Sequence, residues 1–266
     1  MERMLLVAVD IGNSRIKCGI FYPEGWRRKS PEVNCVFSAG LYDPAWRDFA
    51  DPLFAAVAEV PRVTWWIASV NRPVTTDFLE ILRAARPKDE VMLVSSSDLP
   101  LEVAVPHPDR VGIDRLAAAV GANTLRDPNR PAIVVGVGTA VTVNAISKEG
   151  VFLGGAISCG AAMSARALHE FTDLLPLIPT EWQTAPESIG KETPSALAAG
   201  IFWGLVGTVR ELIERQTEVL QGPPEVFLTG GGAKPLVGHL GDDVRFVENL
   251  TLIGIAAAAR AVLDKG

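Results

Sequence analysis

The sequence predicts an α/β protein made of two duplicated domains with a central cleft. In each half of the chain, two short strand-like segments flank a glycine-containing turn, at residues 4–21 and 132–146, which is the pattern of a β-hairpin. Each hairpin is followed by a later strand, a helical stretch and a further short strand. The unit is far longer than a solenoid repeat, so we expect an N-terminal domain over residues 1–113 and a C-terminal domain over 114–266.

The first hairpin opens the N-terminal domain. Residues 4–9 are apolar and predict a buried strand, Asp10 to Ser14 predict a tight turn, and residues 15–21 alternate between polar and apolar as a half-buried strand does. The other elements expected in this half are a strand at 63–70, a helix at 76–84 and a strand at 91–94. A helix at 111–125, after Pro106-His107-Pro108, marks the seam between the halves.

The second half repeats this order. Residues 132–135 and 141–146 predict two strands joined by a turn at 136–140. A strand at 225–228, a helical stretch around Leu236 and a strand at 244–247 complete the copy. Three more helices are expected, at 161–174, 194–220 and 252–263.

The helix at 194–220 is unusual in composition. Thr193 followed by Pro194 fits an N-cap followed by proline at the first helical position. Residues 196–209 are apolar almost all round, and a helix of this kind is buried in a core or against a partner subunit.

Composition and charge exclude several classes of protein. Of 266 residues, 48% are hydrophobic and 21% charged, which is typical of a globular chain and excludes disorder. The net charge of −6 and the lack of a dense basic patch argue against a nucleic-acid partner. Three scattered cysteines and three unclustered histidines predict neither a disulfide framework nor a structural zinc. The apolar stretches at 131–146 and 195–209 are shorter than the ~20 residues that span a bilayer, so we expect no membrane partner and a cytoplasmic location.

The two hairpins together predict a nucleotide clamp. A glycine at each turn lets the backbone approach phosphate oxygens, and the turn N–H groups then bind the anion. A carboxylate at the end of the first strand is suited to a hydrated Mg²⁺ beside those phosphates. The residues with these expected roles are Asp10, Gly12, Asn13, Ser14, Arg15, Lys17, Gly138 and Thr139. The alternative is a pair of ordinary hairpins, but two in matching positions favour the nucleotide site.

Gly112-Ile113-Asp114-Arg115 is the second candidate motif. It opens the helix at the seam, where a carboxylate of Asp114 can point into the cleft and act as a general base on a substrate hydroxyl. Arg115 is suited to an anionic group of the substrate. The alternative is an acid that stabilises the helix dipole beside an arginine in a surface ion pair. The motif alone does not decide between them.

Gly190-Lys191-Glu192-Thr193 resembles the tail of a Walker A loop. Ala185 stands where that loop requires its first glycine, so a P-loop is excluded. We expect Thr193 to cap the following helix and to reach a ligand with its hydroxyl, and Lys191 to be solvated. Gly154-Gly155 and Gly230 to Gly232 are expected to be turns of close approach, the second beside a nucleoside. The alternatives are simple turn chemistry and tight helix–strand packing.

The order of these motifs resembles that of the type III pantothenate kinase family. The resemblance rests on Asp10 to Ser14, Gly112 to Arg115, Gly138 to Thr142, Gly154-Gly155, Gly190 to Thr193 and Thr229 to Gly231. It implies the acetate and sugar kinase/Hsp70/actin fold with duplicated ribonuclease-H-like domains. It also implies ATP-dependent phosphorylation of pantothenate, the first step of coenzyme A synthesis, by a homodimer whose substrate site lies near the interface.

The resemblance also implies residue roles. Asp10 through Lys17 match the family's ATP phosphate segment, and Thr139 matches a threonine that contacts ATP. Gly112, Ile113 and Arg115 match its substrate motif, in which Asp114 is the proton acceptor. Thr193 matches a threonine that contacts the substrate.

Three positions depart from the family pattern. The family places an aspartate that holds a monovalent cation where this chain has Gly136, so dependence on potassium or ammonium is left open. An aromatic residue is expected near Val105, and a proline-glycine pair is replaced by Cys159-Gly160. These departures leave two alternatives: a kinase of the same fold for another small hydroxy compound, and a weakened paralogue with a regulatory binding role.

Overall fold

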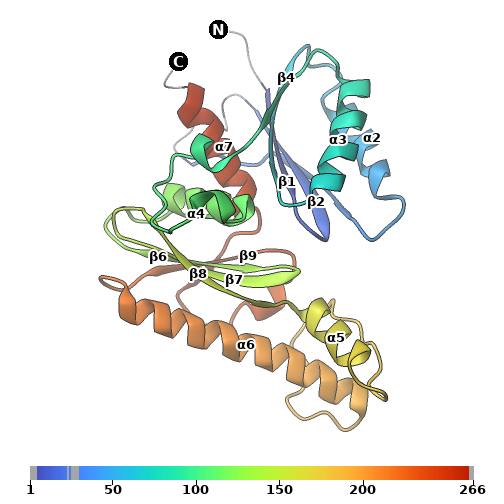
Figure 1. The fold of residues 1–266 in the computed structure, drawn as a ribbon, viewed down its shortest axis with the longest axis vertical. Coiled ribbons are helices and arrows are strands. Elements are labelled where there is room, and N and C mark those ends of the chain that lie inside the picture. Colours follow the sequence, from blue (N-terminus) through green and yellow to red (C-terminus); the bar gives the residue numbers. More distant parts are fainter. Residues whose placement is uncertain (1–4, 23, 25–29, 264–266) are drawn as a thin grey trace. The chain divides into compact units, whose positions relative to one another are not determined.

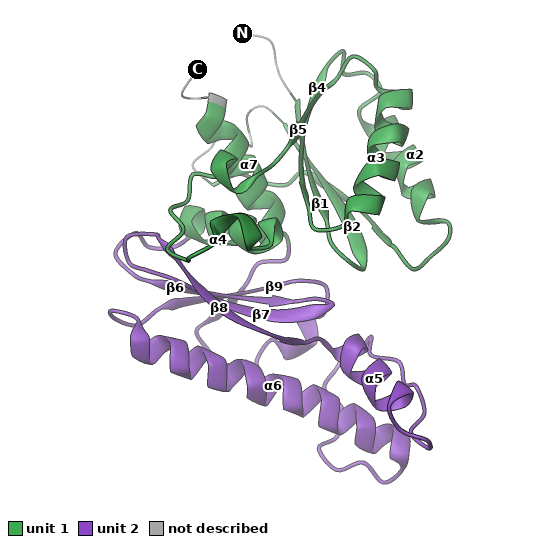
Figure 2. Cartoon of the chain, viewed as in Figure 1, with its two compact units in different colours: residues 1–125, 249–266 green, residues 126–248 purple. Residues whose placement is uncertain are grey.

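The computed structural model describes residues 5–22, 24 and 30–263 of the chain. These residues form two five-stranded sheets with helices (Figure 1). They divide into two compact units, residues 1–125 with 249–266 and residues 126–248 (Figure 2). The division thus falls at residue 125, where the sequence led us to expect 113, and the C-terminal segment belongs to the first unit. The physical reason is the packing of two helices described below.

The sheet of unit 1 has the strand order β3-β2-β1-β4-β5. Strands β1, β2 and β3 are antiparallel neighbours, whereas β1, β4 and β5 run parallel. The strands are β1 (Leu5–Ile11), β2 (Arg15–Phe21), β3 (Cys35–Gly40), β4 (Val63–Ser69) and β5 (Glu90–Leu93). The predicted hairpin and the strands at 63–70 and 91–94 are confirmed, and Met4 lies outside the described residues. Strand β3 was not predicted.

Two helices, α2 (Ala50–Ala56) and α3 (Arg72–Ala85), cover one face of this sheet (Figure 1). They bury Leu53, Phe78 and Leu82 against alternate residues of β1. Helix α3 begins four residues earlier than expected because Asn71 caps it: its side chain accepts a hydrogen bond from Val74 N at 3.3 Å. Helix α2 was not predicted.

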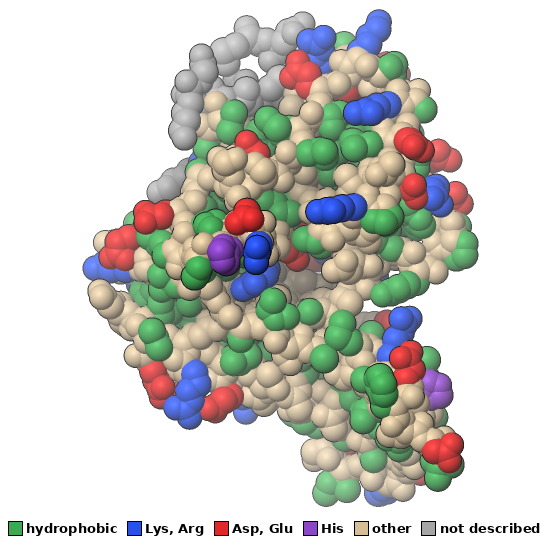
Figure 3. All heavy atoms as spheres, in the orientation of Figure 1, with side chains coloured by type: hydrophobic (Ala, Val, Ile, Leu, Met, Phe, Trp, Pro, Cys, Tyr) green, Lys and Arg blue, Asp and Glu red, His purple; other side chains and the backbone are tan. Residues whose placement is uncertain are grey.

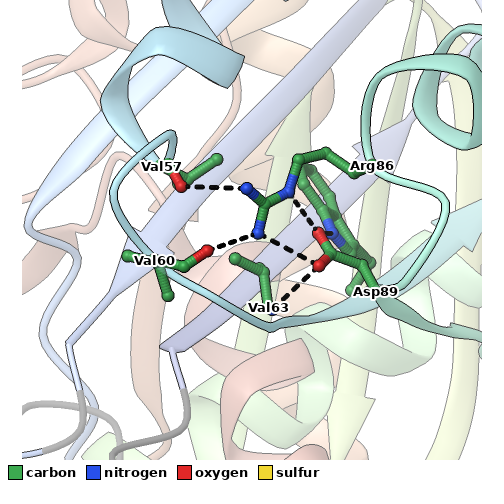
Figure 4. A network of polar contacts seen from close by, with 6 residues as sticks. Val57, Val60, Val63, Arg86 and Asp89 are labelled. Carbon is green, nitrogen blue, oxygen red and sulfur yellow. Dashed lines mark hydrogen bonds and ion pairs between the residues drawn. The ribbon is translucent and has the colours of Figure 1, made fainter.

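A buried polar network holds the loops at one end of this face together (Figure 4). Arg86 pairs with Asp89, whose side chain is only 2% exposed. The Arg86 guanidinium also donates to the carbonyl oxygens of Val57 and Val60, at 3.3 and 2.7 Å. Asp89 in turn accepts from Val63 N and from Trp65 Nε1, at 3.1 and 2.8 Å. Each charge is therefore compensated by several hydrogen bonds.

Helices α4 (Ile113–Leu125) and α7 (Leu250–Leu263) pack against each other and against the sheet of unit 1. Their contact depends on glycine: a β-carbon on Gly121 would lie 2.3 Å from the carbonyl oxygen of Leu250. This contact places the end of the chain in unit 1. The expected helices at 111–125 and 252–263 are confirmed.

The sheet of unit 2 repeats the first one, with the order β10-β9-β6-β7-β8. Strands β6, β7 and β8 are antiparallel neighbours, and β6, β9 and β10 run parallel. The predicted duplication is therefore confirmed in topology as well as in order. The strands are β6 (Ala132–Val137), β7 (Ala140–Ile146), β8 (Phe152–Cys159), β9 (Glu225–Thr229) and β10 (Val244–Phe246).

The sequence analysis was wrong on two points in unit 2. Gly154 and Gly155 do not form a turn but lie within β8, where Gly155 passes so close to β7 that a β-carbon would be 2.1 Å from the carbonyl oxygen of Val143. The stretch around Leu236 is a single 3₁₀ turn, Lys234–Leu236.

Unit 2 also contains α5 (Ala161–Glu170) and the long α6 (Thr193–Val219), and α6 contacts β6 and β7 (Figure 1). Helix α5 ends at Glu170, four residues before the expected end. The N-cap of α6 is Glu192, not the expected Thr193, because Ser195 Oγ accepts from Glu192 N at 3.1 Å.

Within the described part of the chain, α6 is the one helix long and apolar enough to cross a bilayer. Length and composition alone qualify it, and core helices of soluble proteins meet the same criterion. Part of the apolar surface of α6 is buried within unit 2. The side chains that pack into the core of this unit include Phe202, Leu205, Val206 and Val209.

Candidate active site

The β1–β2 hairpin presents charged side chains on one face of the sheet of unit 1. Alternate residues of β1 (Val7, Val9) face the core beneath α2 and α3, so Asp10 lies on the opposite face. Lys17 stands directly across from Asp10 in the strand pairing. Arg15, two residues before Lys17, shares its face. The hairpin therefore brings one acidic side chain, Asp10, and two basic side chains, Arg15 and Lys17, to the same face of the sheet.

The tip of this hairpin is a tight turn held from two sides. Gly12 N donates to the carbonyl oxygen of Arg15 at 2.9 Å, which leaves Asn13 and Ser14 at the apex. From the segment after β3, Leu41 N donates to the carbonyl oxygen of Ser14 at 2.9 Å, and the Ser14 hydroxyl donates to that of Tyr42 at 3.4 Å. Sequence reasoning missed Tyr42, because β3 was not recognised and no local pattern links residue 42 to the hairpin.

Asp114 lies in the first turn of α4, in the same unit. Its carboxylate folds back over Gly112: a β-carbon there would lie 2.5 Å from Asp114 Oδ1. Glycine at 112 is thus required for this conformation of the acid. The carbonyl oxygen of Gly112 also accepts from Arg115 N and Leu116 N, at 3.0 and 3.3 Å, and so starts the helix. Ile113 is buried on the core side of α4.

The charges of the hairpin and of α4 interact. Burial, reinforced by the nearby carboxylate of Asp114, raises the pKa of Asp10 to about 7, while Lys17 acts in the opposite direction. Burial lowers the pKa of Arg115, an effect that Asp114 opposes. Unit 1 therefore brings Asp10, Lys17, Asp114 and Arg115 into one electrostatic cluster, although they are up to 105 positions apart in the sequence.

The β6–β7 hairpin of unit 2 has a shorter tip, Gly138-Thr139, closed by a hydrogen bond from Gly138 N to the carbonyl oxygen of Ala140 at 3.0 Å. Two other glycines pack against it. A β-carbon on Gly160 would lie 2.2 Å from the carbonyl oxygen of Gly138. Gly230 has φ +103° and passes close to Val137, whose carbonyl oxygen would lie 2.3 Å from a β-carbon there.

The glycines of the two hairpin turns, Gly12 and Gly138, are less tightly packed than Gly160 and Gly230. Neither Gly12 nor Gly138 has a positive φ. A β-carbon on Gly138 would meet its nearest neighbour at 3.7 Å, an ordinary contact, and one on Gly12 would meet the carbonyl oxygen of Arg15 at 3.3 Å. The fold alone therefore does not demand glycine at Gly138 and demands it only weakly at Gly12.

The segment before α6 forms a pocket of about 330 Å³ within unit 2. Its lining includes Gly190, Lys191 and Glu192 of the expected substrate segment, together with Ser195 from the first turn of α6. Gly190 is fixed by packing, since a β-carbon would lie 2.1 Å from Ala196 N. Thr193 is exposed at the start of the helix, next to this pocket in the sequence.

Comparison with known proteins identifies the family. A family model described as type III pantothenate kinase matches residues 6–215. The chain belongs to the type III pantothenate kinase family. Curated members from Dehalococcoides mccartyi and Rhodopirellula baltica are each 32% identical to it. The first alignment covers 94% of this chain and 93% of the relative, and the second covers 98% of each. The predicted family is thereby confirmed.

Solved structures confirm the predicted fold of this type III pantothenate kinase family member. A Baf family protein from Campylobacter jejuni has a TM-score of 0.60 at 18% identity and covers 97% of this chain and 99% of that chain. The activator of the 2-hydroxyisocaproyl-CoA dehydratase from Clostridium difficile, solved with bound ADPNP, has a TM-score of 0.52 at 13% identity, covering 98% and 95%. These likenesses establish the actin-like ATPase and sugar kinase fold.

Proposed function

We propose that Asp114 is the general base in the ATP-dependent phosphorylation of pantothenate that defines this family. The observation that carries this proposal is the cluster formed by Asp10 and Asp114, one at the end of β1 and one in the first turn of α4. At Asp10, burial and then the charge of Asp114 raise the pKa to about 7, whereas Asp114 lies in the first turn of a helix. Asp10 lies near the end of β1, at the hairpin proposed to contact the ATP phosphates. We therefore assign the proton transfer to Asp114.

The reaction divides into a proton transfer and a phosphoryl transfer. The Asp114 carboxylate takes the proton from the primary hydroxyl of pantothenate. The hydroxyl oxygen then forms a bond to the γ-phosphorus as the bond from that phosphorus to the β,γ-bridging oxygen breaks, and ADP leaves. Because such a transfer depends mostly on positioning and charge neutralisation, the hairpins contribute as much as the base.

The donor set around Asp10 fits magnesium carried by ATP. Among the described residues, no group of three or more His, Cys, Asp or Glu side chains is placed to hold a metal. Mg²⁺ bound to ATP keeps waters and phosphate oxygens as ligands and needs only one or two carboxylates, and Asp10 supplies one through water. When bound, the ion neutralises charge that develops on the phosphates.

Each hairpin tip is proposed separately as a contact for ATP phosphates. The fold would accept a side chain at position 138 without strain and at position 12 with slight crowding, yet both residues are glycine. The missing side chains support close approach of a ligand to the backbone. Asn13, Ser14 and Thr139 supply short hydrogen-bond donors. Arg15 and Lys17 supply positive charge on the face that carries Asp10.

Two segments are each proposed to contact pantothenate: the start of α4 in unit 1 and the start of α6 in unit 2. Arg115 is suited to the carboxylate of pantothenate, because a guanidinium binds that group through two parallel hydrogen bonds. Gly112 and Ile113 shape the turn that carries the base. Thr193, which follows the pocket residue Glu192 in the sequence, is proposed to contribute its hydroxyl.

We further propose a homodimer that uses α5 and the exposed face of α6. Phe171 and Leu174, just after α5, are 85% and 86% exposed, and Figure 3 shows hydrophobic side chains among charged ones on the surface of unit 2. On α6, a β-carbon on Gly200, Gly204 or Gly207 would meet nothing within 4 Å. Glycine weakens a helix by about 1 kcal/mol relative to alanine, and no contact with the described residues offsets that cost at these three positions. A second copy packed closely against α6 does.

The remaining expectations concern location and partners. A cytoplasmic location is proposed, supported by the packing of α6 onto its own sheet. The net charge of −6 supports the absence of a nucleic-acid partner.

An ADP-release assay with ATP, Mg²⁺ and a panel of small hydroxy compounds tests the substrate. We expect turnover that depends on pantothenate. Turnover with another compound instead would favour a different kinase of this fold, a reading that the departures at Val105 and Gly136 motivate. Tight nucleotide binding without turnover on any compound would favour the regulatory paralogue.

A further inference from the structure

Gly136 occupies the position where the family resemblance leads us to expect an aspartate that holds a monovalent cation. It lies on the central strand β6, opposite Thr142 of β7 on one side and Thr229 of β9 on the other. Both strand partners carry hydroxyls, so neither replaces the missing carboxylate.

The space beside Gly136 is already filled by one of these hydroxyls. A β-carbon at position 136 would lie 2.9 Å from Thr142 Oγ1, closer than such atoms normally approach. Thr142 Oγ1 accepts a hydrogen bond from Asn144 Nδ2 at 3.3 Å, and Asn144 is 1% exposed. A neutral hydroxyl–amide pair therefore stands where a carboxylate would reach.

The second hydroxyl is also engaged. Thr229 Oγ1 donates to the carbonyl oxygen of Glu248 at 3.3 Å. A hydroxyl oxygen can still accept or ligate, but it brings no negative charge. Removing a cation from water is costly unless an anion or a complete ring of oxygens replaces its hydration shell. Neither strand partner of Gly136 carries a carboxylate, and the described residues contain no group of three or more His, Cys, Asp or Glu side chains placed to hold a metal.

We infer that this kinase works without an activating monovalent cation at β6. Gly136 lies two residues before Gly138, at the hairpin proposed to hold phosphate, so a cation there would interact strongly with the nucleotide. In this chain the charge of the phosphates is balanced by other groups. The inference rests on the proposed nucleotide role of this hairpin.

The first test compares buffers at equal ionic strength. The protein is dialysed into tetramethylammonium chloride, and sodium, potassium or ammonium chloride is then added. We expect pantothenate-dependent ADP release to change less than twofold between these salts. A tenfold or greater dependence on potassium or ammonium would overturn the inference.

A binding measurement separates this inference from the proposed function. Calorimetry with a non-hydrolysable ATP analogue and Mg²⁺, in tetramethylammonium and in potassium chloride, requires no turnover of pantothenate. Equal affinities support cation independence even for a protein that phosphorylates another compound. A potassium-dependent gain in affinity of tenfold would contradict it.

A designed variant asks whether charge is what the site lacks. Thr142→Ala makes room, and Gly136→Asp in that background restores the carboxylate. Gly136→Asn in the same background is the matched control, equal in size but neutral. We expect potassium to increase analogue affinity in the Asp variant only. A response of the same size in the wild-type protein would show that the native site already holds the cation and would refute the inference.

Discussion

Gly254 of α7 lies so close to Ala117 of α4 that a β-carbon on Gly254 would be 1.8 Å from the carbonyl oxygen of Ala117. Gly121 makes the reciprocal approach to Leu250. The two helices therefore touch backbone to backbone. Since α4 carries Asp114 in its first turn, this contact helps to fix the position of the proposed base relative to the sheet of unit 1.

Gly254→Ala is expected to destabilise unit 1 strongly. The added methyl group meets backbone on the opposite helix rather than a movable side chain, so α4 and α7 must separate. Overpacking of a core costs about 1–3 kcal/mol, and we expect the upper end of that range in urea unfolding. Gly40→Ala makes the same chemical change in open space at the end of β3, in the same unit, and its stability should stay within about 1 kcal/mol of wild type. Equal effects of the two variants would contradict the close contact.

Asp89→Ala should also unfold the protein at lower denaturant concentration. It removes the acceptor for Val63 N and Trp65 Nε1 and leaves the guanidinium of Arg86 buried without its anion. Breaking one side of a buried pair costs about 3–5 kcal/mol. Glu90→Ala is the control, because Glu90 is 58% exposed and pairs with Arg62 at 3.6 Å, a surface interaction that contributes at most about 1 kcal/mol. A similar loss in both variants would argue against the network.

The parts of the fold predictable from the sequence are those with local signals. In the β1–β2 and β6–β7 hairpins an apolar first strand and an alternating second strand flank a glycine turn, and the later strands β4 and β9 are mostly apolar. Strand β8 was missed because Gly154-Gly155 reads as a turn, although Gly155 is what allows β7 to approach. Strand β3 is an edge strand with mostly exposed side chains, so its apolar pattern is weak. The place of α7 in unit 1 depends on contacts with α4 that have no local signature.

The candidate site shows the same limit. Asp10 and Asp114 were recognisable by their motifs. Their electrostatic interaction, however, depends on α4 packing against the same sheet that carries Asp10. Tyr42 contacts Ser14 through a strand that was not predicted. Thr193-Pro194 suggested a cap at residue 193, yet the hydrogen bond between Glu192 and Ser195 moves it one residue earlier.

The raised pKa of Asp10 predicts how stability varies with pH. The folded protein holds the Asp10 proton up to a pKa of about 7, whereas the unfolded chain releases it near 3.8. The unfolded state thus binds fewer protons between these values, so this group makes stability fall as pH rises from about 4 to 7 and adds no further change above 7. The slope is at most about 1.4 kcal/mol per pH unit.

Asp10→Asn isolates that contribution. The difference in unfolding free energy between wild type and variant, measured by urea titration at pH 4 to 8, should move in favour of the variant as pH rises. A difference that is independent of pH would show that Asp10 titrates near its ordinary value.

Gly204→Leu is expected to disrupt the proposed dimer. The leucine side chain projects from the exposed face of α6, where a second copy would have to approach the backbone. Light scattering should give twice 28.4 kDa for the wild type and 28.4 kDa for the variant. Ala84→Leu, on an exposed position of α3, adds the same side chain in unit 1 and should leave the mass unchanged. A wild-type protein of 28.4 kDa at micromolar concentration would refute the dimer itself.

Asp114→Asn tests the base. The amide keeps the size of the carboxylate but cannot accept the proton, so we expect kcat to fall by about 10²–10⁴. Affinity for ATP should change little, because the proposed phosphate contacts are made by the hairpin tips and not by Asp114. The KM for pantothenate should also stay within a few-fold if the amide still receives the hydroxyl. Arg115→Lys is the contrasting variant: losing the paired hydrogen bonds to an anion should raise the KM for pantothenate more than it lowers kcat. Unchanged kcat in Asp114→Asn would exclude Asp114 as the proton acceptor.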